Sequence, residues 1–157
     1  MTLPLIISTI FTLNFPFVVA NDAPEKIISI SGGYTNVIRP GQSLIAVYVS
    51  AIKNSSNKDV DLIAVSSPSA KSIEIHSMQV VDNVMKMKKE HKITIPAKSK
   101  VSLGKKNPNG YHLMVFDLSP QITEKNMFTI NLSFSNGENL LTNVTVKKHT
   151  ENQHEHH

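Results

Sequence analysis

Between residues 27 and 148 the chain consists of short runs rich in β-branched and apolar residues, separated by turn-forming residues. The run at 43–50, Ser-Leu-Ile-Ala-Val-Tyr-Val-Ser, is typical, and no stretch repeats its apolar residues at the period of a long helix. Short runs of this composition predict β-strands rather than helices. The expected strands cover residues 43–50, 60–66, 72–79, 83–88, 92–95, 100–103, 111–118, 127–135 and 140–148.

The turns between these runs favour a fold of antiparallel strands. Asn136-Gly137 lies between two runs of alternating apolar residues, which is a strong local signal for a β-hairpin. Short strands at this spacing predict an all-β domain, either an antiparallel sandwich or a Greek-key barrel. The chain has 157 residues and no internal repeat or linker, so we expect one domain over residues 21–148. The other turn signals are Arg39-Pro40-Gly41, Asn54-Ser55-Ser56-Asn57 and Asn107-Pro108-Asn109-Gly110.

Residues 1–20 differ in composition from the rest of the chain. They carry no charged side chain, are rich in Leu, Ile, Phe and Val, and end in Val18-Val19-Ala20. Such a segment predicts a signal peptide that is removed on export, and hence a periplasmic or otherwise exported protein without stable membrane insertion. The alternative is an uncleaved membrane anchor, because the run is about as long as the shortest spans, although Pro4 and Pro16 disfavour it. The chain contains no cysteine, so lipid attachment at a lipobox is not expected.

Histidine and methionine gather in the middle of the chain. Four of the six methionines lie between residues 76 and 114. Side chains two residues apart on a strand point to the same face, so each close pair of these residues shares a face of its strand. The pairs are His76 with Met78, Met85 with Met87, and His112 with Met114.

Two imidazoles and two thioethers brought together would suit a soft d¹⁰ ion that accepts tetrahedral geometry. Copper(I) fits this donor set best, because zinc prefers thiolate to thioether. Thioethers carry no proton, so the methionines would bind copper without releasing one. Taken alone, a methionine on a strand is more often core filling than a ligand. An electron-transfer blue-copper site is disfavoured, because it needs a Cys thiolate and the chain has no cysteine.

The order and spacing of these residues resemble the motif of the periplasmic copper chaperones called the PCuAC family. That motif is a His, ten intervening residues, a Met, a spacer of about twenty residues and His-x-Met. Here His76 is followed by Met78, ten residues separate His76 from Met87, and His112-Leu113-Met114 completes the pattern. The spacer from Met87 to His112 has 24 residues, and we expect the extra ones in the turn at 105–109. Flanking stretches from residue 27 to residue 148 are also similar to the family, including Val47-Tyr48-Val49, Lys53-Asn54 and Ile95-Pro96-Ala97.

This resemblance implies a cupredoxin-like β-sandwich that binds one Cu(I) near its surface through His76, Met87, His112 and Met114. It also implies delivery of the ion to the copper centre of cytochrome oxidase, either directly or through a thioredoxin-like copper chaperone. Met78 and Met85 are expected to shield the site or to catch the ion during exchange, with packing in the core as an equally open alternative.

Residues 149–157 form a polar segment that holds four of the seven histidines. Imidazoles and carboxylates favour Cu(II) over Cu(I), so we expect this tail to capture Cu(II) and to supply the main site after reduction. The alternative is an incidental polar tail without a metal role. The four histidines are His149, His154, His156 and His157.

Other classes of function find less support. The formal net charge is +4, but the lysines are scattered and no aromatic residues interleave with them, which disfavours nucleic-acid binding. The sequence has no nucleophile elbow, no phosphate-binding loop and no pair of catalytic carboxylates, so we expect no enzymatic activity. The alternative that stays open is an exported β-sandwich that mediates adhesion or another interaction without a metal.

Overall fold

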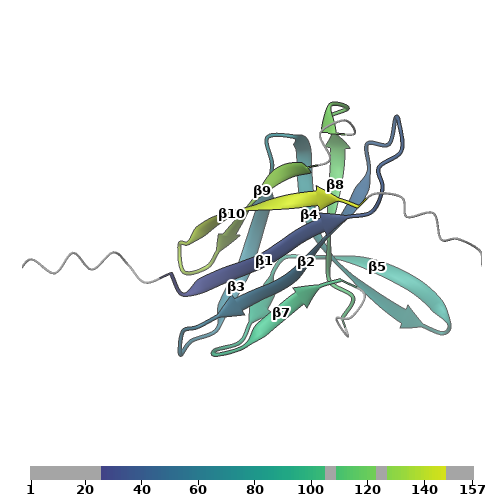
Figure 1. The fold of residues 1–157 in the computed structure, drawn as a ribbon. Helices are drawn as coiled ribbons and strands as arrows, with labels where there is room; N and C mark the ends of the chain where they lie inside the picture. Colours follow the sequence, from purple (N-terminus) through teal and green to yellow (C-terminus); the bar gives the residue numbers. More distant parts are fainter. Residues whose placement is uncertain (1–25, 105–108, 123–126, 148–157) are drawn as a thin grey trace, which may run out of the picture.

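The computed structural model describes residues 26–104, 109–122 and 127–147, and those ranges contain ten β-strands (Figure 1). The nine strands expected from the sequence correspond in order to β2 through β10, so the all-β class is confirmed. The expected signal peptide at 1–20, the tail at 149–157 and most of the turn at 105–109 lie outside the described residues. The strands are β1 (Ile28–Thr35), β2 (Ile45–Asn54), β3 (Val60–Ser66), β4 (Ala70–Val81), β5 (Val84–Glu90), β6 (Ile93–Ile95), β7 (Lys100–Leu103), β8 (His112–Leu118), β9 (Met127–Phe134) and β10 (Asn139–Val146).

The strand that the sequence pattern did not predict is β1, which contains Gly32-Gly33. Glycine weakens a strand pattern and often marks a close approach of another backbone. A Cβ atom at Gly33 would lie 2.8 Å from the carbonyl oxygen of Asn143 on β10, so glycine is needed where β10 passes. The strand β1 is therefore stabilised by its pairing with β2 and β10 rather than by its local composition.

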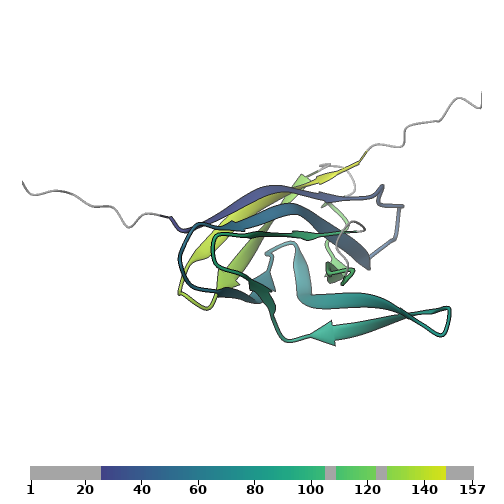
Figure 2. The same ribbon diagram turned by 90° about the horizontal axis from the view of Figure 1, so that it is seen from below.

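The strands form one mixed sheet in the order β5-β4-β8-β2-β1-β10-β9-β3-β6, with β7 alongside β2. The pairing of β1 with β10 is parallel, which departs from the antiparallel expectation. Parallel neighbours need a long connection, and here nearly the whole domain lies between these two strands. The sheet is strongly curved (Figure 2). As a result β3 lies near β4, and β6 lies near β2, although the two strands of each pair are not neighbours in the sheet order.

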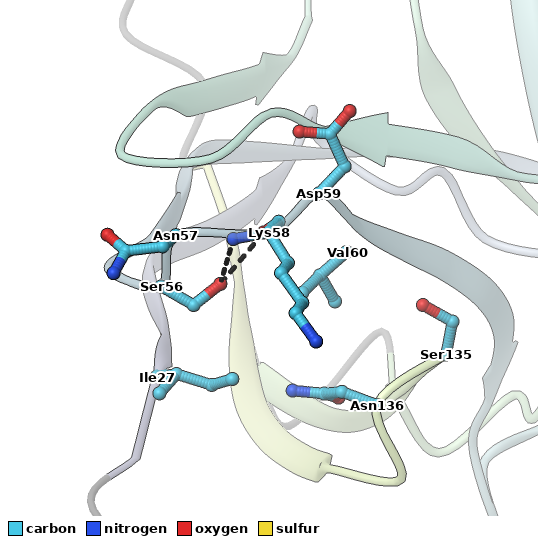
Figure 3. A pocket seen from close by; sticks show the side chains of 8 residues that line it. All are labelled: Ile27, Ser56, Asn57, Lys58, Asp59, Val60, Ser135 and Asn136. Atoms are coloured by element: carbon cyan, nitrogen blue, oxygen red, sulfur yellow. Dashed lines mark hydrogen bonds between the residues drawn. The ribbon is translucent and has the colours of Figure 1, made fainter.

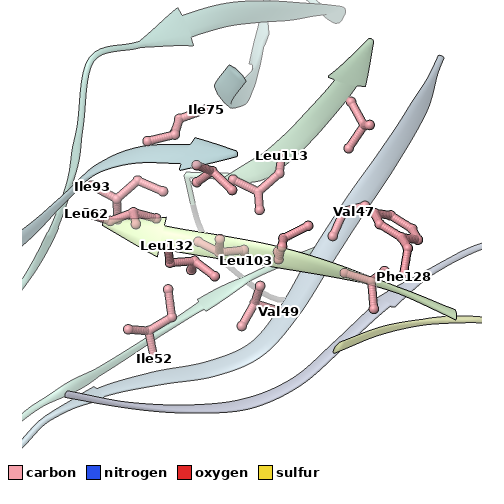
Figure 4. Close-up of a cluster of buried hydrophobic side chains, with 14 of the residues drawn as sticks. Val47, Val49, Ile52, Leu62, Ile75, Ile93, Leu103, Leu113, Phe128 and Leu132 are labelled. Atoms are coloured by element: carbon pink, nitrogen blue, oxygen red, sulfur yellow. The ribbon is translucent and has the colours of Figure 1, made fainter. Parts of the chain in front are cut away.

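The concave side of the curved sheet holds the hydrophobic core (Figure 4). Alternate residues of each central strand enter it, as Val47 and Val49 do on β2 and Leu113 does on β8. Burying a side chain of this kind contributes about 1.5–3 kcal/mol to folding. The residues between them, including Ala46, Tyr48 and His112, consequently face the other side of the sheet.

The β4–β5 hairpin extends beyond the body of the domain (Figures 1 and 2). Its turn consists of Asp82 and Asn83, both with positive φ, and Val81 pairs with Val84 on either side. Two central residues with positive φ give a type I′ turn, whose twist matches that of the flanking strands. Among the described residues no helix is long and apolar enough to cross a membrane.

Candidate metal centre

Strands β5, β4 and β8 are neighbours in the sheet and carry all six of the histidines and methionines singled out between residues 76 and 114. Directly opposed residues on antiparallel strands project from the same face. The register thus places the candidate side chains, with one carboxylate, on one face of three adjacent strands. It pairs His76 with His112, Met78 with Met87, and Glu74 with Met114.

The two imidazoles lie side by side. Their ring centroids are 5.9 Å apart with the rings tilted by 57°, although 35 residues separate the two positions in the chain. His112 is buried, with 6% of its surface exposed, and the His76 side chain is 16% exposed. Both rings are therefore held by the protein and partly shielded from water, as a ligand pair for one ion requires.

A small hollow of about 170 Å³ adjoins this pair, and we call it the Met–His hollow. Three of the four expected ligands, Met87, His112 and Met114, line it, and His76 stands beside it against His112. Met78 also contributes to its wall, directly opposite Met87. The complete lining is Ala46, Tyr48, Met78, Met87, Gly104, Gly110, His112 and Met114.

The tautomer of His112 follows from its hydrogen bond to Gly110. Its Nδ1 lies 2.8 Å from the carbonyl oxygen of Gly110. A carbonyl oxygen can only accept, so the proton is on Nδ1 and the lone pair is on Nε2. A metal-binding histidine is commonly held in this way, by a backbone carbonyl on its other nitrogen.

His76 presents the opposite nitrogen. Its Nε2 lies 2.9 Å from Oε2 of Glu74, so this nitrogen donates to the carboxylate. Its Nδ1 is buried and has no hydrogen-bond partner among the described residues. A buried polar atom without a partner costs about 1–3 kcal/mol, and a metal ion bound there would remove that cost. The orphaned lone pair is thus a second nitrogen donor.

Glu74 is itself fixed on both oxygens. The hydrogen bond from His76, and after it the hydrogen bond from Lys89, holds the pKa of the Glu74 carboxyl below its usual range. The carboxylate therefore stays ionised and keeps accepting from Nε2 of His76. Glu74 lies two residues before His76 on β4 and therefore on the same face of the strand. The structure adds the hydrogen bond by which its carboxylate can orient the His76 ring.

Gly110 also belongs to the site. In the sequence it is only the last residue of a predicted turn, so the sequence did not identify it as a site residue. It has a positive φ, and a Cβ atom there would lie 2.6 Å from the carbonyl oxygen of Met78. The amide of Met78 also donates to the carbonyl of Asn109, 3.2 Å away. Glycine at this position lets the segment before β8 pack directly against β4, which brings Met78 to the wall of the Met–His hollow.

Met85 and Met87 differ in their relation to the hollow, although both are strongly exposed, at 66% and 63%. Met87 lines the hollow, whereas Met85 pairs with Val80, one step nearer the hairpin turn, and is not part of the lining. Met85 is thus available at the surface but not at the candidate centre.

Another hollow, which shares no lining residue with the Met–His hollow, offers no comparable donors (Figure 3). It is lined by Ile27, Ser56, Asn57, Lys58, Asp59, Val60, Ser135 and Asn136. Within the described part of the chain no group of three or more His, Cys, Asp or Glu residues is placed to hold a metal. Of the sites described here, only the Met–His hollow combines imidazole with thioether donors.

Comparison with known proteins agrees with this fold. The family model LpqE-like, described as a lipoprotein family, matches residues 28–146. The copper-bound PCuAC domain from PmoF2 is 21% identical, with a TM-score of 0.61, over 77% of this chain and 92% of that one. The Cu(I) form of DR1885 from Deinococcus radiodurans is 24% identical, with a TM-score of 0.54, over 82% and 85%. No curated protein matches the chain. At these identities the two structures show a shared cupredoxin-like fold.

Replacing Glu74 with alanine tests whether this carboxylate orients His76. We expect NMR of the metal-free protein to show His76 protonated at Nε2 in the wild type and as a mixture of tautomers in Glu74→Ala. Loss of such an outer partner typically weakens metal binding by about 10- to 100-fold. Lys89→Ala is the matched control, because it keeps the Glu74–His76 hydrogen bond. An unchanged tautomer in Glu74→Ala would show that the carboxylate has no such role.

Proposed function

The chain belongs to the LpqE-like family and has the fold of PCuAC domains, and on this premise we propose that it is an exported copper carrier. It holds one Cu(I) at the Met–His hollow and releases it to another protein. The observation that supports the proposal is the side-by-side placement of two imidazoles, each with one nitrogen free of hydrogen bonds to the described residues, on the face of β5, β4 and β8 that also carries thioethers. A carrier of this kind only makes and breaks coordination bonds, so no catalytic role is proposed.

The proposed ligands are Nδ1 of His76, Nε2 of His112 and the sulfur atoms of Met87 and Met114. Two neutral nitrogens and two thioethers form an uncharged, soft donor set, which suits monovalent copper better than a hard divalent ion. The mostly apolar wall of the hollow supports the same choice, since Cu(I) carries a single charge to be removed from water.

Met78 has a different role in this proposal. It lies opposite Met87 and lines the hollow from β4. Its sulfur can therefore replace that of Met87 as a ligand when Met87 dissociates from the ion. Met87 is on β5, at the edge of the sheet, and is 63% exposed. An incoming protein can therefore displace Met87 first, while His112 and Met114 still hold the ion from β8.

The destination that we propose is the copper centre of cytochrome oxidase, reached directly or through a thioredoxin-like copper chaperone. The resemblance of the His76–Met87–His112–Met114 motif to the PCuAC motif supports this recipient. Export is supported by the lipoprotein description of the family and by the composition of residues 1–20. Exchange of one ligand at a time suits delivery to a partner whose own soft ligands replace those of the carrier.

We also propose that residues 149–157 bind Cu(II) through His149, His154, His156 and His157. Their imidazoles stand among carboxylates and amides, a donor set that prefers the divalent ion. The ion would move to the Met–His hollow only after reduction by an external reductant.

Titration with Cu(I) against a competing chelator tests the main site. We expect one tight equivalent, weakened by about 10-fold or more in His76→Ala, Met87→Ala, His112→Ala and Met114→Ala, because even outer-shell losses reach that size. Met85→Ala is the matched control, since Met85 is as exposed as Met87 but lies outside the hollow. Binding that survives all four substitutions would contradict the Met–His hollow as the copper site, and a wild-type protein that binds no Cu(I) would leave the interaction module without a metal.

Titration with Cu(II) tests the tail. Deleting residues 150–157 removes three of its four histidines, so the number of Cu(II) ions bound should fall while the single Cu(I) equivalent stays. An unchanged Cu(II) stoichiometry would contradict the role of the tail and leave the main site untouched.

A further inference from the structure

A second hollow, of about 610 Å³, lies next to the Met–His hollow, and we call it the tyrosine groove. The two share Tyr48 and Gly104, so they adjoin each other. The lining of the groove is Tyr34, Asn36, Tyr48, Val49, Ser50, Lys100, Ser102, Leu103, Gly104 and Lys147.

The groove has an aromatic floor that ends at the last described residue of the chain. The rings of Tyr34 and Tyr48 are 5.3 Å apart between centroids. The ammonium of Lys147 lies 4.2 Å from the centroid of the Tyr34 ring, and the Lys147 amide donates to the carbonyl of Thr35. The chain therefore leaves the described domain at the outer end of this groove, with the Met–His hollow at the inner end.

The charges of the groove and of the chain that follows it are complementary. Lys100 and Lys147 line the groove, and no aspartate or glutamate is part of its lining. The segment 148–157 contains two carboxylates, Glu151 and Glu155, and one lysine, Lys148, at its start. Opposite charges of this kind favour the docking of that segment at moderate salt.

The lengths also match. The lining of the Met–His hollow runs from β2, two strands from β10 in the sheet order, to β5, five strands from β10. The hollow therefore extends from about 10 Å to about 24 Å from β10 at the usual strand spacing. An extended chain advances about 3.3–3.6 Å per residue. His149 can therefore move only about 7 Å from Lys147, whereas His154 can reach about 23–25 Å.

We propose that the tyrosine groove is the docking site of the chain's own residues 148–157. Docking brings His154, His156 and His157 to the Met–His hollow and leaves His149 over the outer end of the groove. The assignment of copper to that hollow rests on the proposed function, but the docking itself requires no metal.

Spin labelling of the metal-free, full chain tests the docking, and the absence of native cysteine allows a label at a single position. A nitroxide at His154→Cys should cause loss of the amide signals of Gly104 and His112. The matched label at His149→Cys should instead act most strongly on Tyr34 and Asn36 and more weakly on His112 than the label at His154→Cys does. Adding Lys100→Glu and Lys147→Glu, or raising the salt to well above the range in which surface charges attract, should restore the lost signals.

Equal effects of the two labels, or signals of Gly104 and His112 that stay intact with the label at His154→Cys, would overturn the docking. A Cu(I) titration of a variant that lacks residues 148–157 keeps this result separate from the proposed function. One tight equivalent in that variant supports the copper site whether or not the segment docks.

Discussion

The register between β4 and its two neighbours is the constraint on which the candidate site depends. Ile75 lies opposite Leu113, and both are buried in the core. A slip of one residue would turn these apolar side chains out and the histidines in, so burial of the core strongly favours the observed register. His76 and His112 are the next residues on each strand, and they must therefore project together from the outer face. The hydrophobic core thus aligns a polar site that it does not itself contain.

The groups around the two imidazoles decide which nitrogens are available. Nε2–H of His76 donates to Glu74, and Nδ1–H of His112 donates to the Gly110 carbonyl, so the other nitrogen of each ring is the unprotonated one. On the β8 side the donors are held by a central strand, whereas on the β5 side they belong to an exposed edge. This difference suits the proposed carrier, because an ion would be kept by the buried side and exchanged at the exposed side.

Much of the fold and part of the site could be predicted from the sequence. Turn residues and alternation were sufficient for β2 through β10, and alternation alone placed His112 with Met114 on one face. The strand β1 was missed because its Gly32-Gly33 pair is typical of an interruption between strands. Its parallel pairing with β10 joins the two ends of the domain, and local sequence patterns do not indicate such a contact. Met78 and Met85 had equal standing in the sequence, and only the register of β4 with β5 separates them. The roles of Glu74 and Gly110 depend on contacts between atoms, which spacing does not specify.

X-ray absorption at the copper edge of the protein loaded with one equivalent of Cu(I) tests the account most directly, because it identifies the neighbours of the ion without any substitution. Two sulfur and two nitrogen neighbours are predicted, from the two thioethers and the two imidazoles that the strand register brings together. A first shell of nitrogen and oxygen alone would contradict the assignment of the Met–His hollow as the copper site.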